Sequence, residues 1–111
     1  MCGIVGLLNT GDGSKNYITK MLHSINHRGP DETIQFNDDF FYGGMNRLSI
    51  NDIKGGSQPL FNNDKSVVVL YNGEIYNHLN LKAKLQKKGK KFNSFSDGEV
   101  IAHLYEDVGE K

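Results

Sequence analysis

The sequence has 111 residues, and its 13 basic and 13 acidic side chains give a formal net charge of zero. A chain of this length is enough for one small domain rather than two. The balanced charge creates no basic field that would attract nucleic acid or an anionic membrane, so we expect neither as a partner. The longest apolar run, at residues 67–71, is far too short to cross a bilayer.

The first residues of the chain carry no targeting signal. No basic region precedes the apolar run that begins at Gly3, which argues against a secretory signal peptide. Cys2 is the only cysteine, so an internal disulfide is excluded. Together these features predict a cytoplasmic protein.

The first half of the chain predicts a strand, a helix and a second strand. Residues 3–8 form an apolar run typical of a buried strand. Residues 14 to about 26 have apolar side chains at helical spacing, and Pro30 disfavours helix just before it. Residues 40–48 are rich in aromatic residues and predict a strand, in which Gly43 and Gly44 indicate a bulge or the close approach of another backbone.

The second half predicts a loop, a strand and two helices. Residues 66–71 are continuously apolar, which favours a strand covered on both faces. A short helix follows Asn77 and ends at Gly89, and its lysines are typical of a solvated face. A capping box at Ser96 and Glu99 predicts the start of the last helix.

That last helix is expected to end at Gly109 and to bury one apolar stripe. The stripe consists of Val100, Ile101, Leu104, Tyr105 and Val108. Strands in the centre with helices outside predict a layered α+β architecture. No closing strands follow the last helix, so we expect these 111 residues alone to be marginally folded and to expose apolar surface.

Cys2 is the first candidate for chemistry. A lone cysteine at the start of a strand is often only a small apolar residue, and that interpretation stays open. Removal of Met1 would leave Cys2 with both a thiol and an α-amine. An amine with an ordinary pKa of about 8 can take a proton from a neighbouring nucleophile, so one residue could supply nucleophile and base.

Asn72 and Gly73, in the segment YNGEIYN, are the second candidate. An Asn-Gly pair at a strand end is also a common turn, and this alternative suffices if the pair is taken alone. The functional interpretation is an oxyanion hole, because an Asn side-chain NH₂ and a Gly backbone N–H can converge on one developing negative charge.

Three charged residues could recognise an amino acid. Arg47 is either a surface charge or a bidentate partner for an α-carboxylate. Asp97 together with Glu74 could hold the matching α-ammonium, although Asp97 could also serve as a helix cap. His23 and His27 stand four apart, but the glutamate of the zinc protease motif and a third ligand are missing, so we expect no metal site.

Six segments together resemble the glutaminase domain of the asparagine synthetases, which are class II glutamine amidotransferases. They occur in the family's order and at similar spacing, from residue 1 to about residue 105. One departure is Gly98, where relatives more often carry a bulkier residue. The matching segments are Met1-Cys2-Gly3-Ile4, His27-Arg28-Gly29-Pro30-Asp31, Arg47-Leu48-Ser49-Ile50, Gln58-Pro59-Leu60, Asn72-Gly73-Glu74-Ile75-Tyr76-Asn77 and Ser96-Asp97-Gly98-Glu99-Val100-Ile101.

The resemblance implies catalytic roles for three residues. Cys2 would be the nucleophile that takes ammonia from glutamine, and Asn72 and Gly73 would form the oxyanion pair. The loop at residues 28–31 would border the site. A glutamyl thioester would form on the cysteine and be hydrolysed to glutamate.

The resemblance also implies a substrate-binding set. Arg47 would hold the α-carboxylate of glutamine, while Glu74 and Asp97 would contact its α-amino group. The backbone near Leu48 and Ile50 would line the pocket.

The implied fold is the αββα sandwich of the N-terminal-nucleophile hydrolases. Residues 1–111 would be a partial glutaminase domain, the incomplete front portion of that sandwich. No cofactor is implied for the chain itself. ATP and Mg²⁺ belong to the C-terminal synthetase domain, which is an expected partner together with glutamine, and full-length relatives imply a possible homodimer.

Three alternatives remain open at this point. The chain could be another class II amidotransferase, of phosphosugar, purine, polysaccharide or natural-product synthesis. It could be a cysteine protease that pairs Cys2 with His78 or His103, although no local motif supports this. It could also be a non-catalytic remnant.

Overall fold

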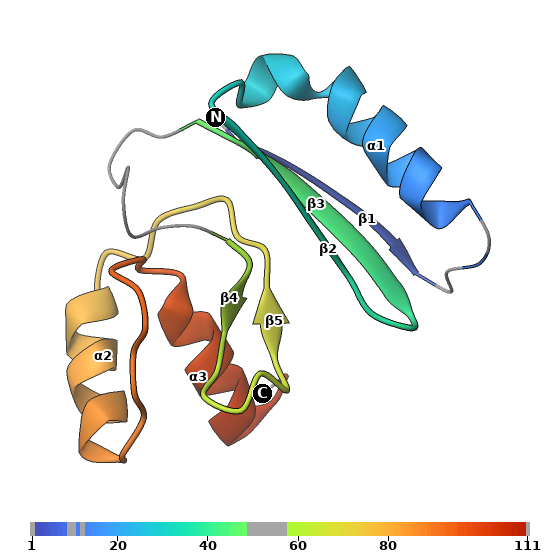
Figure 1. Cartoon of the computed structure of the whole chain (residues 1–111). Coiled ribbons are helices and arrows are strands. Elements are labelled where there is room, and N and C mark those ends of the chain that lie inside the picture. The colour runs from blue at the N-terminus through green and yellow to red at the C-terminus, as the bar shows by residue number, and fades with distance from the viewer. Residues whose placement is uncertain (1, 9–10, 12, 49–57, 111) are drawn as a thin grey trace. The chain divides into compact units, whose positions relative to one another are not determined.

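The computed structural model describes residues 2–8, 11, 13–48 and 58–110. The chain divides into two compact units, Met1–Asn51 (unit 1) and Asp52–Lys111 (unit 2), which are described separately. Helices and small antiparallel sheets are mixed along the chain (Figure 1). The α+β class predicted from the sequence is therefore confirmed.

Unit 1 is built on a three-stranded antiparallel sheet in the order β1-β3-β2. Strands β1 (Gly3–Leu8) and β2 (Glu32–Asn37) both pair with the central strand β3 (Phe41–Arg47). The register runs without interruption from Gly3 opposite Asn46 to Leu8 opposite Phe41. The strand predicted at residues 3–8 is present with the same bounds, but its predicted burial was wrong, since Ile4 and Leu8 are 43% and 77% exposed. Strand β2 was not predicted.

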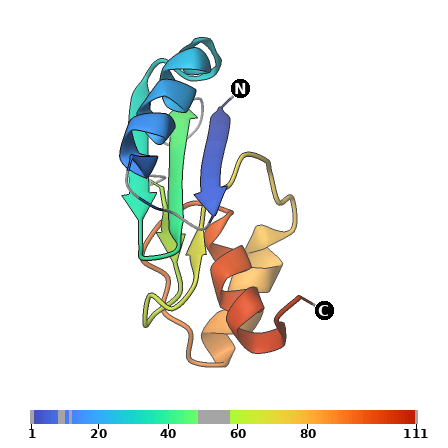
Figure 2. The ribbon, with the colours of Figure 1, turned by 90° about the vertical axis from the view of Figure 1, so that its right-hand side faces the viewer.

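Helix α1 (Ser14–Ser24) covers one face of this sheet, as Figures 1 and 2 show. Ile18 and Leu22 of the helix pack with Val5 of β1, and all three are at least nine-tenths buried. Complete burial of such a side chain stabilises a fold by about 1.5–3 kcal/mol. This cluster is the core of unit 1.

Gly44 explains how the helix comes so close to the sheet. A Cβ atom at this position would lie 2.7 Å from Cδ1 of Leu22. A bulge or the close approach of another backbone was predicted at Gly43 and Gly44. The continuous register contradicts the bulge. The close approach is confirmed at Gly44, where a Cβ atom would also lie 3.0 Å from the Ile34 backbone oxygen of β2.

A short 3₁₀ helix, η1 (Asn26–Arg28), follows α1 and leads toward β2. The predicted helix to residue 26 therefore ends two residues earlier as an α-helix, at Ser24. Gly29 then lies against β3, where a Cβ atom would collide with the backbone of Asn46 and Arg47. Only glycine allows the chain to approach the central strand this closely.

Unit 2 contains a small hairpin and two helices. Strands β4 (Leu60–Phe61) and β5 (Val68–Val69) are antiparallel, with Leu60 opposite Val69 and Phe61 opposite Val68. The Gln58–Pro59 peptide bond before β4 is cis. The strand predicted at residues 66–71 is thus only two residues long, and its valines are half-buried rather than covered on both faces.

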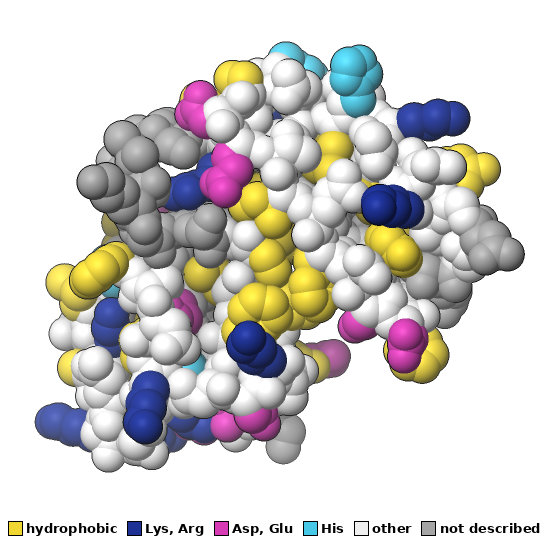
Figure 3. Space-filling view, in the orientation of Figure 1, with side chains coloured by type: hydrophobic (Ala, Val, Ile, Leu, Met, Phe, Trp, Pro, Cys, Tyr) yellow, Lys and Arg dark blue, Asp and Glu magenta, His cyan; other side chains and the backbone are white. Residues whose placement is uncertain are grey.

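Helices α2 (His78–Lys87) and α3 (Glu99–Val108) follow, and each ends as the sequence predicted. Gly89 and Gly109 stand just beyond them with φ of 89° and 64°. Such left-handed backbone favours glycine and terminates a helix. Lysine side chains gather over α2 (Figure 3), and Lys84, Lys87 and Lys88 are exposed, in agreement with a solvated face.

The predicted capping box of α3 was wrong. Gly98 is the cap residue, and no side chain caps the helix. The buried carboxylate of Glu99 instead accepts hydrogen bonds from the backbone N–H groups of Asn93 and Ser94, both at 2.8 Å. A buried carboxylate needs such donors, because an unsatisfied charge inside a protein is costly.

The apolar stripe of α3 was also only partly correct. Val100 is buried, but Tyr105 and Val108 are 46% and 49% exposed. Ala102 and His103 are buried in their place, and the ring of His103 lies 4.5 Å from that of Phe92. The expected exposed apolar surface is present among the described residues (Figure 3). The most exposed large apolar side chains are Leu8, Phe40, Tyr76, Leu79 and Phe95.

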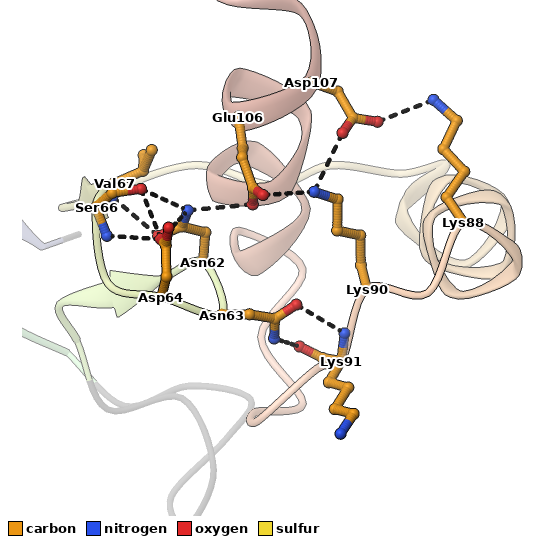
Figure 4. Close-up of polar contacts among 10 residues, drawn as sticks. All are labelled: Asn62, Asn63, Asp64, Ser66, Val67, Lys88, Lys90, Lys91, Glu106 and Asp107. Carbon is orange, nitrogen blue, oxygen red and sulfur yellow. Dashed lines mark hydrogen bonds and ion pairs between the residues drawn. The ribbon is translucent and has the colours of Figure 1, made fainter.

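A polar network ties α3 to the hairpin and to the segment after α2 (Figure 4). Glu106 accepts hydrogen bonds from Lys90 at 2.6 Å and from the buried amide of Asn62 at 3.1 Å. Asp107 bonds Lys88 and also pairs with Lys90. Hydrogen bonding to Glu106 raises the pKa of Lys90, and the same bond lowers the pKa of Glu106.

No helix within the described residues is long and apolar enough to span a bilayer.

Candidate functional site

The predicted site residues fall into two sets. Cys2, Arg47 and Leu48 belong to unit 1. The second set belongs to unit 2 and consists of Asn72, Gly73, Glu74 and Asp97. Ile50 lies outside the described residues, so its place in the pocket stays a prediction.

Cys2 stands directly before β1 and is half-buried. Its Sγ accepts a hydrogen bond from the backbone N–H of Leu48 at 3.4 Å, and Sγ lies 3.8 Å from the Leu48 carbonyl oxygen, to which the thiol can donate. Leu48 follows the end of β3, and the pairing of Gly3 with Asn46 brings these two chain segments side by side. The sheet register therefore sets the position of the thiol.

Arg28 holds the other side of Cys2. Its Nε donates a hydrogen bond to the Cys2 carbonyl oxygen at 3.2 Å. The approach depends on Gly3, since a Cβ atom there would lie 3.3 Å from Cδ of Arg28 and 2.6 Å from Cδ1 of Ile25. The resemblance implied only that the loop at residues 28–31 borders the site, and the bond from Arg28 to Cys2 was not predicted.

Arg47 lies at the end of β3, directly opposite Glu32 of β2. One guanidinium nitrogen is 3.2 Å from a Glu32 carboxylate oxygen, and the Arg47 side chain is only 11% exposed. The Arg47 carbonyl also accepts a hydrogen bond from the N–H of Asp31 at 3.1 Å. Arg47 is thus a restrained cation at the strand end that carries Leu48, where it could meet a carboxylate.

Asn46 is a buried polar residue that sequence reasoning did not single out. Its side-chain amide donates to the Leu22 carbonyl oxygen at 2.5 Å and accepts from the Thr33 hydroxyl at 2.9 Å. It therefore ties the end of α1 and strand β2 to β3, beside Arg47. Its polar type within a strand of aromatic and small residues was the available signal.

In unit 2, the segment at residues 71–75 carries the candidate oxyanion donors. The Tyr71 ring packs against two glycines, because a Cβ on Gly73 would lie 2.9 Å from the phenolic oxygen and one on Gly98 would lie 2.6 Å from Cδ1. Gly98, where the resemblance led us to expect a bulkier residue, therefore packs closely against the Tyr71 ring. A bulkier residue at this position would force the ring to move.

Asp97 fixes the far end of the same segment. One of its carboxylate oxygens accepts a hydrogen bond from the Ile75 N–H at 2.6 Å. Burial raises the pKa of the Tyr71 phenol, and the negative charges of Asp97 and Glu74 raise it further. Both carboxylates are therefore close enough to Tyr71 to act on it electrostatically. The helix-capping alternative for Asp97 finds no support, since no side chain caps α3.

Between Tyr71, which packs against two glycines, and Ile75, which is bonded to Asp97, the residues Asn72, Gly73 and Glu74 are exposed. An exposed Asn amide and a backbone N–H can donate to an oxyanion, and the carboxylate of Glu74 on the same segment, with that of Asp97 bonded to its end, can attract an ammonium group. Within residues 2–8, 11, 13–48 and 58–110, no cluster of three or more metal-ligating side chains is present.

Comparison with known proteins gives the family. Residues 1–111 match the family model described as a glutamine amidotransferase domain. The chain is 47% identical to an asparagine synthetase [glutamine-hydrolyzing] of Brassica oleracea, over 99% of this chain and 19% of that protein. It is 48% identical to asparagine synthetase [glutamine-hydrolyzing] 2 of Oryza sativa subsp. japonica, over 100% of this chain and 19% of that protein.

A bacterial relative shows the same relation. Asparagine synthetase [glutamine-hydrolyzing] 1 of Bacillus subtilis (strain 168) is 40% identical, over 100% of this chain and 18% of that protein. The chain spans about a fifth of the length of these curated relatives. The match of all 111 residues to the family model shows that the chain belongs to the glutamine amidotransferase domain family.

Proposed function

We propose that this chain is the ammonia-supplying part of a glutamine-hydrolysing asparagine synthetase, in which Cys2 converts glutamine to glutamate and ammonia. The observation that carries the proposal is the position of the Cys2 thiol on the backbone of Leu48, one residue from the restrained Arg47 cation. This arrangement occurs in a chain of the glutamine amidotransferase domain family.

In the proposed reaction, removal of Met1 leaves Cys2 with an α-amine. The amine takes the thiol proton while sulfur attacks the side-chain amide carbon of glutamine. The resulting oxyanion accepts hydrogen bonds from the Asn72 side chain and the Gly73 N–H, and loss of one such donor typically costs ~10²–10³ in rate. The α-ammonium then protonates the leaving nitrogen, and the C–N bond breaks to release ammonia.

The second half-reaction uses water. The glutamyl thioester on Cys2 is attacked by a water molecule, with the α-amine as general base, and the C–S bond breaks to give glutamate and the thiol. Arg47 holds the α-carboxylate of the substrate, and Glu74 and Asp97 face its α-ammonium. The backbone of Leu48, and of Ile50 beyond it, borders the substrate.

The proposal extends to the rest of the protein. We propose that the domain has the complete αββα sandwich in the full-length protein. A C-terminal synthetase domain there uses ATP and Mg²⁺, with ammonia as co-substrate. The full-length protein forms a homodimer. The proposal also places the protein in the cytoplasm, where a single thiol stays reduced. The names and lengths of the relatives support the synthetase partner.

The test is to retain a residue ahead of Cys2. In the polypeptide that naturally carries this sequence, we expect an uncleavable residue before Cys2 to abolish glutamine hydrolysis as completely as Cys2→Ala, because both remove the pairing of thiol and α-amine. A glutamine-like electrophile should label only the processed protein, at Cys2, as read by mass spectrometry. Full glutaminase activity with the extra residue present would return Cys2 to a merely structural role.

A further inference from the structure

Gln58 makes two short hydrogen bonds to the backbone of one residue. Its side-chain Nε2 donates to the Tyr71 carbonyl oxygen at 2.7 Å, and its Oε1 accepts from the Tyr71 N–H at 2.6 Å. Gln58 is half-buried and belongs to the Gln-Pro-Leu segment that the sequence analysis matched to the family without assigning a role. The proposed reaction does not use it.

The place of these bonds at the end of the hairpin explains their use. Backbone pairing of the hairpin ends at Leu60 opposite Val69, and Gln58 and Tyr71 each lie two residues beyond that pair in the chain. In an antiparallel pair, the N–H and carbonyl groups of a paired residue are both bonded by the opposite backbone. At Tyr71 the side-chain amide of Gln58 bonds both groups instead.

The bonds to Tyr71 matter for the two residues after it. Asn72 and Gly73, the candidate oxyanion donors, come next in the chain, and both are exposed. Strand β5 ends at Val69, and among the described residues its pairing with β4 extends no further. Gln58 at Tyr71 and Asp97 at Ile75 are then hydrogen-bonded anchors at the two ends of the segment that presents the donors.

We propose that Gln58 is a positioning residue for the oxyanion hole, which it aligns by fixing the backbone of Tyr71. This inference rests on the proposed glutaminase function. Gln58 has no role in holding the substrate, so its loss misaligns the donors in the transition state while ground-state binding of glutamine is retained.

The chain offers a matched control for this arrangement. The amide of Asn63 makes the same pair of bonds to Lys91: its Nδ2 donates to the carbonyl oxygen at 2.6 Å, and its Oδ1 accepts from the N–H at 3.1 Å (Figure 4). Asn63 is exposed and carries no candidate donor next to its partner. Replacement of the Asn63 amide removes the same pair of side-chain-to-backbone hydrogen bonds at Lys91 and leaves the bonds to residues 71–75 unchanged.

The experiment compares Gln58→Glu with Asn63→Asp in the polypeptide that naturally carries this sequence. In each variant the carboxylate keeps an oxygen that can accept from the backbone N–H. The amide NH₂ that donated to the backbone carbonyl is replaced by a second oxygen, which cannot donate. We expect Gln58→Glu to lower kcat for glutamine hydrolysis by ~10²-fold, as for a displacement of about 1 Å in catalytic geometry, with little change in KM. Asn63→Asp should leave both constants at the parent values.

Amide hydrogen exchange gives a second readout that does not depend on catalysis. The Tyr71 N–H should be protected in the parent and exchange faster in Gln58→Glu and Gln58→Ala. An unprotected Tyr71 N–H in the parent would overturn the inference even if both variants fail to fold.

The kinetic outcomes separate the inference from the proposed function. An active parent with parental kcat in Gln58→Glu overturns the positioning role alone. A rise in KM at parental kcat does the same, since it would place Gln58 on the substrate. An inactive, correctly processed parent overturns the glutaminase proposal and this inference with it.

Discussion

In unit 1, Cys2, Arg47 and Leu48 lie at the ends of strands whose pairing is continuous along the whole of β1. In unit 2, Asn72, Gly73 and Glu74 follow a strand of two residues and are held at each end by one side chain, Gln58 and Asp97. The first set is positioned by many backbone hydrogen bonds together. The second depends on a few individual side chains.

This difference predicts where each unit is sensitive. A ladder distributes the position of Cys2 over many bonds, so it should be disturbed mainly by changes that push backbones apart. A segment held by two side chains should respond to single substitutions that leave the fold intact. Substitutions in both units test this contrast.

The largest effect is expected for Arg47→Ala. Arg47 is proposed to hold the substrate carboxylate by charge-assisted hydrogen bonds, each of which contributes about 1.5–3 kcal/mol. Loss of two such bonds should raise KM for glutamine by ~10²-fold or more. Steady-state glutaminase kinetics measure this.

Glu32→Gln is the matched control, because it removes the charge that faces Arg47 but leaves the guanidinium in the strand. We expect a much smaller rise in KM than for Arg47→Ala. Equal effects of the two substitutions would show that Arg47 acts through the ion pair with Glu32 and not on the substrate.

The next effect tests the packing of unit 1. Gly29→Ala would place a Cβ in the backbone of Asn46 and Arg47, and overpacking of this kind costs about 1–3 kcal/mol. We expect a loss of stability in this range, measured by denaturant unfolding. Gly11→Ala is the control, since no atom of the described residues lies within 4 Å of its Cβ position, and the stability of this variant should differ from that of the parent by at most about 0.5 kcal/mol. Equal stabilities would remove the argument that β3 needs a glycine beside it.

A smaller effect is expected for Asp97→Asn, which separates two roles of one side chain. Asparagine keeps an oxygen that can accept from the Ile75 N–H but removes the charge proposed to face the substrate ammonium. We expect KM to rise about tenfold at nearly constant kcat, the value of one charged hydrogen bond. Asp97→Ala should lower kcat as well. An Asn variant identical to the parent would leave Asp97 with the anchoring role alone.

The smallest effect concerns the network of Lys90, Glu106 and Asp107. The pKa values of both carboxyls are lowered, so their stabilising contribution is present above the unfolded values and is lost as pH falls through the folded ones. The pKa of Lys90 is raised, so its contribution is lost as pH rises through the folded value. We expect the melting temperature to fall below about pH 4 and above about pH 10.

Lys90→Met should make both losses shallower, because it removes the shared partner of the two carboxyls. Lys84→Met, on the exposed face of α2, should keep the parental pH profile. Melting curves across the two pH ranges check this, and parallel profiles for parent and Lys90→Met would show that the network contributes nothing to acid or base stability.

The local sequence was sufficient where a single short-range signal dominates. The apolar run at residues 3–8 gave β1 with its correct bounds, and Gly89 and Gly109 gave the ends of two helices. The motif segments gave the candidate residues and the family. These features depend on residue type and spacing, which are present in the chain before it folds.

The tertiary structure decided the contacts that have no periodic signal. Strand β2 alternates between exposed and half-buried residues and is defined by its pairing with β3. Glu99 is drawn to Asn93 and Ser94 because its burial demands donors, which overrides the local capping pattern. The bonds from Arg28 to Cys2 and from Gln58 to Tyr71 join residues 26 and 13 positions apart. Sequence alone determined which groups the chain carries, and the folded backbone decided which of them meet, because a hydrogen bond needs its two atoms within about 3 Å.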